Sequence, residues 1–216
     1  MPRAHGAPVE AFVSPDVPAA KIASMRALGA RVHVSAQPAR VARDHASGGD
    51  ERLLVLDGQR PEMAEGAGTI ALELEALGPI DLAVVQVGDG ALVSGIACWL
   101  KHARPQTRVV GVCASGAPAM ARSYASGRVV STPDTDTIAT AIAISEPIPE
   151  SFARVTALVD EIVLVDDDDL RAAQQLILDN LGTAVEPAGA AGVAAVARHG
   201  ERLHRGRTAV LLTGVG

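Results

Sequence analysis

Aromatic residues are scarce in this chain of 216 residues, and basic residues are not in excess. Only 2% of the residues are Phe, Trp or Tyr, so the surface offers little on which nucleic-acid bases could stack. The 19 Lys and Arg residues are outnumbered by 25 Asp and Glu residues, which gives a net charge of −6 and no broad basic face. Nucleic acid is therefore not an expected partner.

Cysteines and long apolar runs are also few. The two cysteines, Cys98 and Cys113, lie too far apart for a C-x-x-C metal or redox motif. No apolar run is long enough to cross a bilayer, and residues 1–13 lack the continuous apolar core of a signal peptide. We expect a cytoplasmic protein that makes no contact with a membrane.

What the chain does have is abundant apolar residues in an alternating order. Its hydrophobic content of 48% is enough to bury a substantial core. Strand-like runs alternate with helix-like runs, which is the pattern of βαβ units. The expected strands are 9–13, 31–34, 53–56, 82–87, 108–112, 162–165 and 208–212, and the expected helices are 18–28, 36–46, 69–77, 93–103, 117–125 and 170–181. The sequence therefore predicts an α/β fold with a mostly parallel sheet and helices on both faces, with a linker at 46–52.

A glycine-rich turn between a strand and a helix, "VVQVGDGALVSGI" at 84–96, is the main candidate site. Such a turn directs free backbone N–H groups and the positive end of a helix dipole at one point, which suits a phosphate or a carboxylate. A P-loop needs Lys and Ser/Thr after its second glycine, and a dinucleotide fingerprint needs an earlier third glycine and a later acidic residue. Neither pattern is present. A single-phosphate loop or a tight turn without a ligand remains, and Asp89 places a carboxylate in its middle.

The acidic run "VDDDDLR" at 165–171 and the six histidines are metal-ligating residue types. A calcium loop needs a glycine and a distal glutamate at fixed offsets, and both are missing. Acidic residues at the start of a helix complement its dipole and cap its free N–H groups, so capping is favoured over metal binding. The histidines show no pairing at metal-ligand spacing, and no metal site is expected.

Several segments, in order, resemble the threonine and serine dehydratase branch of the fold-type II enzymes that use pyridoxal phosphate (PLP). The matching segments are "EGAGTIALELE" (65–75), "VGDGALVSGIA" (87–97), "VVGVCASGAPAMARSYASGRVV" (109–130), "DTDTIATAIA" (134–143), "VEPAGAAGVAAV" (185–196) and "LLTGVG" (211–216). Residues 11–32 resemble the small-domain unit of the same branch. The resemblance implies a three-layer, parallel-sheet architecture in which residues 1–52 are the remainder of a small α/β domain and residues 53–216 form a large PLP-binding domain.

The resemblance also implies roles for particular residues. Thr213 would bond the pyridine nitrogen of PLP without forcing its protonation, and a neutral ring suits β-elimination of a hydroxyl. Glu186 matches the glutamate of the family's V-E-P motif and would be a buried carboxylate near cofactor and substrate. The residues expected to hold the cofactor's phosphate are Gly88, Asp89, Gly90, Ala91 and Leu92. A bulky residue in place of Gly90 is expected to abolish phosphate or PLP binding and to leave the fold intact.

The chain departs from the family pattern at functionally central positions. The family's Schiff-base lysine, in S-F-K-x-R-G-A, and its ring-binding asparagine, in S-x-G-N-H-A, have no counterpart. The two lysines, Lys21 and Lys101, match non-catalytic positions and are expected to be solvated. Ala141 stands where the family has a glycine close to the ring. The cation-binding acids of the serine racemase branch would fall at Cys113 and Ala119, so that site is not expected, and Cys113 is expected to be a small core residue.

Two hypotheses follow from these matches and departures. In the first, the chain is the larger, N-terminally truncated part of a PLP-dependent dehydratase, inactive alone and dimeric when complete, that converts a hydroxy amino acid to a 2-oxo acid. In the second, it is a non-catalytic remnant or a phosphate- or PLP-binding module of the same fold. The upstream DNA would distinguish a misplaced start, a frameshift and a separate gene for the lysine-bearing segment.

Overall fold

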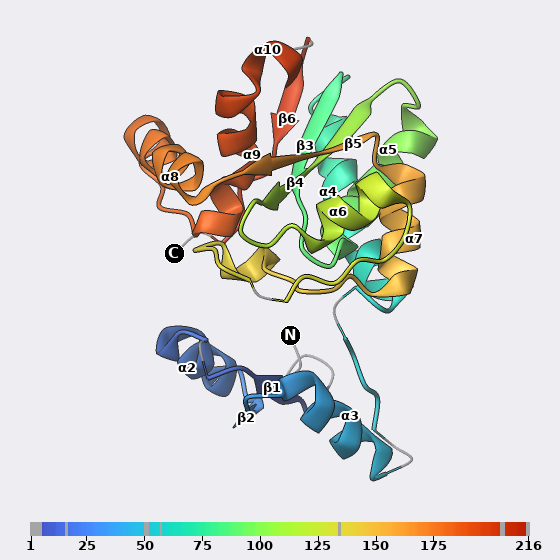
Figure 1. Cartoon of the computed structure of the whole chain (residues 1–216), viewed down its shortest axis with the longest axis vertical. Coiled ribbons are helices and arrows are strands. Elements are labelled where there is room, and N and C mark those ends of the chain that lie inside the picture. The colour runs from blue at the N-terminus through green and yellow to red at the C-terminus, as the bar shows by residue number, and fades with distance from the viewer. Residues whose placement is uncertain are drawn as a thin grey trace. The chain divides into compact units, whose positions relative to one another are not determined.

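The chain divides into two compact units, Met1–Leu56 and Asp57–Gly216. The structure is a computed structural model, and it describes residues 6–15, 17–49, 52–56, 58–133, 135–203 and 206–214 (Figure 1). Each unit is treated by itself below. The assignment of residues 1–52 to a small domain and of 53–216 to a cofactor-binding domain stays a prediction.

The first unit contains two parallel strands and two helices. Strand β1 (Glu10–Val13) is connected by α2 (Ala19–Ala27) to its parallel partner β2 (Arg31–Val34), and α3 (Pro38–Ser47) follows β2. This order of strand, helix and strand is the βαβ unit expected from the sequence. Side chains from its strands and α3 meet in one cluster, in which His33 and His45 both bond the Glu10 carboxylate, at 2.7 and 3.1 Å.

The second unit is built on a four-stranded parallel sheet in the order β5-β4-β3-β6. Its strands are β3 (Leu82–Gln86), β4 (Arg108–Ala114), β5 (Glu161–Val165) and β6 (Thr208–Val210). In register, Val84 of β3 lies between Val110 of β4 and Val210 of β6. Every residue of β3 is buried, because a central parallel strand is covered on both faces, and this explains its nearly continuous apolar sequence.

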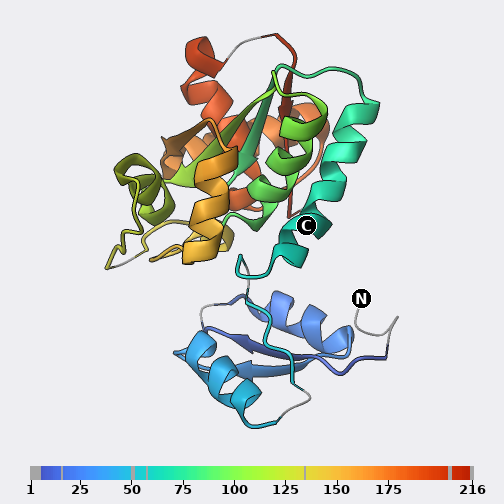
Figure 2. The same cartoon turned by 90° about the vertical axis from the view of Figure 1, so that its right-hand side faces the viewer.

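Helices cover both faces of this sheet (Figure 2). One apolar core joins the sheet to α8 and α9, and a second joins it to α4, α5, α6 and α7. The helices are α4 (Pro61–Ala76), α5 (Ala91–Ala103), α6 (Ala119–Ser126), α7 (Pro149–Leu158), α8 (Asp167–Leu181), α9 (Pro187–Arg198) and α10 (Gly200–Leu203), with a 3₁₀ turn, η1, at Thr140–Ile142. The three-layer parallel α/β fold expected from the sequence is therefore confirmed.

Some expected elements differ from those in the structure. Residues 52–56 form no strand, and their apolar side chains, Leu53 and Val55, are exposed rather than paired against a sheet. Helix α4 begins at Pro61 instead of residue 69, because Gly66 and Gly68 do not break the helix, and Gly68 lies against α5. Helix α7 was not expected at all.

Glycines allow α4 and α5 to pack closely. A Cβ atom on Gly95 of α5 would lie 1.9 Å from the Ala64 carbonyl oxygen of α4, and one on Gly68 of α4 would lie 3.1 Å from the Gly95 oxygen. The two helix backbones therefore approach each other where neither carries a side chain. This contact fixes the position of α5, and with it the glycine-rich loop that precedes the helix.

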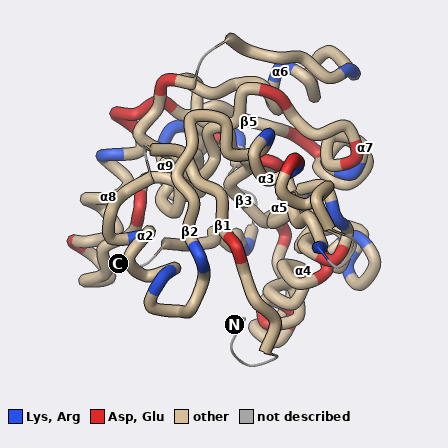
Figure 3. The backbone as a smooth tube through the Cα atoms, turned by 90° about the horizontal axis from the view of Figure 1, so that it is seen from below, with Lys and Arg blue, Asp and Glu red and all other residues tan. Residues whose placement is uncertain are grey.

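Acidic and basic residues are interspersed along the backbone of both units (Figure 3). Some form ion pairs across elements, such as Arg108 of β4 with Glu161 of β5 at 2.9 Å. Of the helices in the described part of the chain, none combines the length and apolarity that crossing a bilayer requires.

Candidate functional site

A pocket of about 280 Å³ opens beyond the carboxyl end of β3 in the second unit. This is the edge at which open parallel sheets bind ligands, and the volume is near the lower end of small-molecule sites, about 300 Å³. The pocket is lined by Met63, Ala67, Gln86, Gly88, Gly90, Ala91, Leu92, Ala141, Ile142, Glu186, Ala188 and Thr213. It therefore brings together five of the six residues expected to bind the cofactor, and Glu186.

The glycine-rich loop forms one wall of the pocket. Gly90 is the N-cap of α5 and adopts a left-handed conformation, with φ +91°, which favours glycine. The N-cap residue of α5, Gly90, has no side chain and makes no capping hydrogen bond to the first turn. An uncapped helix start that faces a pocket is suited to an anion. Asp89 does not line the pocket, and its carbonyl oxygen accepts a hydrogen bond from the Ser151 hydroxyl of α7.

Helix α7 packs against this loop and leaves no room for a side chain at Gly90. A Cβ atom there would lie 2.5 Å from Val155 Cγ2 and 2.9 Å from Ser151 Oγ, and both residues are buried. The expectation that a bulky residue could replace Gly90 with the fold intact is therefore wrong, because the residue would displace α7 and strain the backbone.

Gln86 and Thr213, which also line the pocket, form a hydrogen-bonded pair. The sequence analysis did not identify Gln86 as a site residue. The signal that could have identified it is that Gln86 is the one polar side chain of the otherwise apolar strand β3.

Two glycines bring Thr213 and Glu186 to the same place. A Cβ atom on Gly189 of α9 would lie 1.9 Å from the Thr213 carbonyl oxygen, and one on Gly214 would lie 2.2 Å from Glu186 Cγ. The Glu186 N–H also donates to the Gly214 oxygen at 2.9 Å. Glu186 is only partly buried, instead of the buried carboxylate expected, because it stands at the N-cap of α9 and lines an open pocket. Of the expected terminal motif, residues 215 and 216 lie outside the described residues.

The acidic run at the start of α8 also supports the pocket. Asp166 and Asp169 form a capping box, so the expected capping role is confirmed. Donation from the Asp169 N–H, and then from Arg198, lowers the pKa of the Asp166 carboxyl. Asp167 has a further role that the sequence did not reveal, because its two oxygens accept from the Thr137 hydroxyl at 2.6 Å and the Ile138 N–H at 3.1 Å. This anchors the segment that leads to the pocket-lining turn η1.

Lys101, the lysine of the second unit, does not line the pocket. Lys101 is at the far end of α5, where Nζ donates to Asp160 Oδ2 at 2.6 Å and to the Thr107 carbonyl at 3.1 Å. The expectation that Lys101 is simply solvated is therefore wrong, because Asp160, 59 positions along the chain, provides an ion pair at a partly buried site. Lys21 is an exposed residue of α2 in the first unit.

Cys113 and Ala119, the positions of the other branch's cation-binding acids, are both buried among apolar side chains. Burial raises the pKa of the Cys113 thiol to about 12. Cys113 is thus an inert core residue, as expected. Among the residues that the structure describes, no group of three or more His, Cys, Asp or Glu side chains could hold a metal ion.

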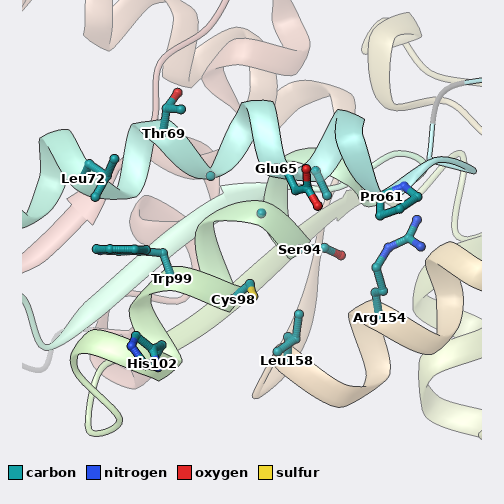
Figure 4. Close-up of a pocket in the computed structure, with 13 residues that line it drawn as sticks. Pro61, Glu65, Thr69, Leu72, Ser94, Cys98, Trp99, His102, Arg154 and Leu158 are labelled. Carbon is teal, nitrogen blue, oxygen red and sulfur yellow. The ribbon is translucent and has the colours of Figure 1, made fainter.

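A second, larger pocket of about 470 Å³ lies between α4, α5 and α7 (Figure 4). Apolar side chains such as Leu72, Trp99 and Leu158 dominate it. Leu72 and Trp99 lie at one end and Arg154 at the other, with Glu65 between them. None of the residues expected from the sequence to bind a cofactor lines this pocket. The residues expected from the sequence to bind cofactor and substrate therefore lie at the pocket beside β3, apart from Asp89.

Comparisons with known proteins agree with the resemblance seen in the sequence. The sequence profile of the family described as "Pyridoxal-phosphate dependent enzyme" matches residues 2–214. L-threonine ammonia-lyase of Geobacter sulfurreducens is 32% identical over 213 residues, which are 97% of this chain and 53% of that protein. L-threonine ammonia-lyase of Thermotoga maritima is 33% identical over 195 residues, which are 88% of this chain and 49% of that protein. The chain thus spans about half the length of these curated relatives.

Solved structures show the same relationship. Maize serine racemase superposes with a TM-score of 0.90 at 26% identity, over 99% of this chain and 67% of that one. The processed form of threonine deaminase isoform 2 from Solanum lycopersicum superposes with a TM-score of 0.89 at 26% identity, over 98% of this chain and 63% of that one. The profile match and the two ammonia-lyases lead to one assignment: the chain belongs to the fold-type II family of pyridoxal-phosphate-dependent enzymes, among relatives that include L-threonine ammonia-lyases.

Proposed function

We propose that the pocket beside β3 binds PLP for a threonine- or serine-type ammonia-lyase reaction. The phosphate would lie on the loop from Gly88 to Ala91 and the start of α5, and the ring nitrogen would face Thr213. The observation that supports this most strongly is that the uncapped start of α5, Thr213 and Glu186 line one pocket although they are far apart in the chain.

The loop has the features that a phosphate site needs. The N–H groups of the first turn of α5, together with those of the loop, provide several charge-assisted donors, and the helix dipole adds to their attraction. Asp89 would contribute only its backbone, since the residue is absent from the pocket lining and its carbonyl is held by α7. Gly88, Ala91 and Leu92 complete the proposed phosphate site.

The pair of Gln86 and Thr213 fits a pyridine ring. The buried amide of Gln86 has an oxygen without a partner among the described residues, and its nitrogen bonds the Thr213 hydroxyl, so this pair offers polar groups to a ring. Bound PLP supplies an electron sink for negative charge on the substrate's α-carbon. Glu186 places a carboxylate at the rim, where we propose that it faces the amino acid substrate.

The reaction proposed for the whole protein removes water and then ammonia from serine, threonine or a related hydroxy amino acid. Lys101 of the second unit does not line the pocket, and neither lysine of the chain stands in the family's S-F-K-x-R-G-A motif, so we propose that alone the chain binds the cofactor and does not turn over substrate. This same observation favours the second candidate, a PLP- or phosphate-binding module without catalysis. The homodimer and the cytoplasmic location expected from the sequence remain predictions.

Replacing Ala91 with glutamate tests the proposed phosphate site. Ala91 is the first residue of α5 and lines the pocket, so a carboxylate there would repel a phosphate a few ångströms away. The same carboxylate interacts favourably with the helix N-terminus, by about 0.3–1 kcal/mol, so the fold should be retained. We expect the affinity for PLP and for inorganic phosphate, measured by calorimetry at constant ionic strength, to fall roughly 100-fold.

Two control variants separate charge and size from position. Ala19→Glu adds the same charge at the first residue of α2, an exposed position with no acidic residue in its first turn, and should leave the affinity unchanged. Ala91→Gln has the size of glutamate without its charge and should weaken binding much less than Ala91→Glu. If Ala91→Glu and Ala19→Glu bind PLP and inorganic phosphate with equal affinity, the proposal that the loop binds the phosphate is wrong.

A further inference from the structure

Gln86 is a buried amide with one of its two polar atoms unbonded. Its side chain is at the carboxyl end of β3 and the residue is 4% exposed. Nε2 donates to Thr213 Oγ1 at 2.7 Å, whereas Oε1 has no partner among the residues that the structure describes. Buried amides are normally fully bonded, so an incompletely bonded one in a pocket wall indicates a role in the site rather than in packing.

The direction of this hydrogen bond decides what Thr213 can do. A threonine hydroxyl has one hydrogen to donate and two lone pairs that accept. Because Gln86 Nε2 donates to it, Thr213 Oγ1 uses a lone pair and keeps its hydrogen for a third group. The opposite orientation of the amide would consume that hydrogen and leave a buried NH₂ group without an acceptor, which is the less favourable arrangement.

We propose that Gln86 is a positioning residue that makes Thr213 a hydrogen-bond donor to the pyridine nitrogen and so keeps that nitrogen unprotonated. This inference rests on the proposed function, since it requires the ring to face Thr213. A donor stabilises the lone pair of an unprotonated nitrogen, whereas an acceptor stabilises the protonated form. The amide of Gln86 thereby sets the electronic state of a ring that it need not touch.

The test follows the ring nitrogen directly. PLP labelled with ¹⁵N in the ring is bound to the chain, and the nitrogen's chemical shift is recorded as a function of pH. In Gln86→Met, which is close to glutamine in shape, Thr213 is free to accept as well as to donate. We expect the midpoint of nitrogen protonation to rise by about one pH unit, a tenfold change in the protonation equilibrium. Gln37→Met, an exposed site in the first unit, is the matched control and should leave the midpoint unchanged.

A double-mutant comparison separates positioning from packing. If Gln86 acts through Thr213, then Gln86→Met should not change the midpoint when Thr213 is already valine, and a general packing effect would persist in that background. Gln86→Leu provides a second variant if the methionine variant does not fold. Binding of PLP by the wild-type chain with an unchanged midpoint in the Gln86 variants would overturn this inference alone. Absence of PLP binding by the wild-type chain would overturn the proposed function and this inference together.

Discussion

Incubated with PLP and then with L-serine or L-threonine, the 216-residue chain will release no 2-oxo acid above the rate given by free PLP. Proton transfer by a positioned group typically contributes roughly 10²–10⁴-fold to a rate, and the nucleophile that holds the cofactor adds to this. Lys101 cannot take that role in this structure, because it is paired with Asp160 at the far end of α5. Lys21 lies in the segment V-P-A-A-K-I, which does not match the family's lysine motif.

The measurement combines a product assay with borohydride reduction and mass spectrometry of the two lysines. L-threonine ammonia-lyase of Geobacter sulfurreducens, assayed in parallel, is the positive control. The expected result is no product and no stoichiometric adduct on either lysine. A specific adduct at Lys21 or Lys101 together with turnover would contradict the proposal.

Replacing Gly95 with alanine will destabilise the second unit by more than about 3 kcal/mol, near or above the upper end of the usual cost of overpacking. The new Cβ atom would lie 1.9 Å from the Ala64 carbonyl oxygen and 2.7 Å from the Gly68 nitrogen. These are backbone atoms, which cannot rotate away as a flexible side chain can, so α4 and α5 would have to separate. Urea unfolding followed by circular dichroism measures the loss.

Gly66→Ala is the control for this substitution. Gly66 belongs to α4, the same helix that Gly95 contacts, but a Cβ atom there meets nothing within 4 Å. An alanine in a helix interior is more favourable than glycine, so we expect a gain of about 0.5–1 kcal/mol. Opposite signs for the two variants would show that close backbone approach, rather than glycine content, fixes α5. Equal stability of Gly95→Ala and the wild-type chain would contradict the packing described here.

The sequence predicted what depends on local pattern. The apolar strands of the sheet and the glycine loop before α5 follow from periodicity and from glycine's freedom at Gly90. The cap at Asp166 follows from acidic residues at the start of a helix, and the structure contains it. These features need no knowledge of distant residues.

Features that depend on distant partners were not predicted. The bond from Gln86 to Thr213 joins residues 127 positions apart, and the apolar pattern that predicts a strand at 82–87 carries no information on which distant residue Gln86 meets. The contact of Asp167 with Thr137 spans 30 positions and the ion pair of Lys101 with Asp160 spans 59 positions, so both also lie beyond the range of local pattern. Helix α7 was not predicted, and its place in the fold depends on distant residues, since its buried residue Val155 packs in the core shared with α5. The glycine-rich loop and the resemblance to a family identified the candidate site. The structure added the contacts that position its residues, such as the hydrogen bond from Gln86 to Thr213.

The most direct test of the central claim is a crystal structure of this chain with PLP bound. We expect the phosphate group on the backbone N–H groups of the loop at Gly88–Ala91 and the start of α5. We also expect the ring nitrogen within hydrogen-bond distance of Thr213 Oγ1. Cofactor bound instead in the apolar pocket between α4, α5 and α7, or a phosphate away from the loop, would contradict the proposed site.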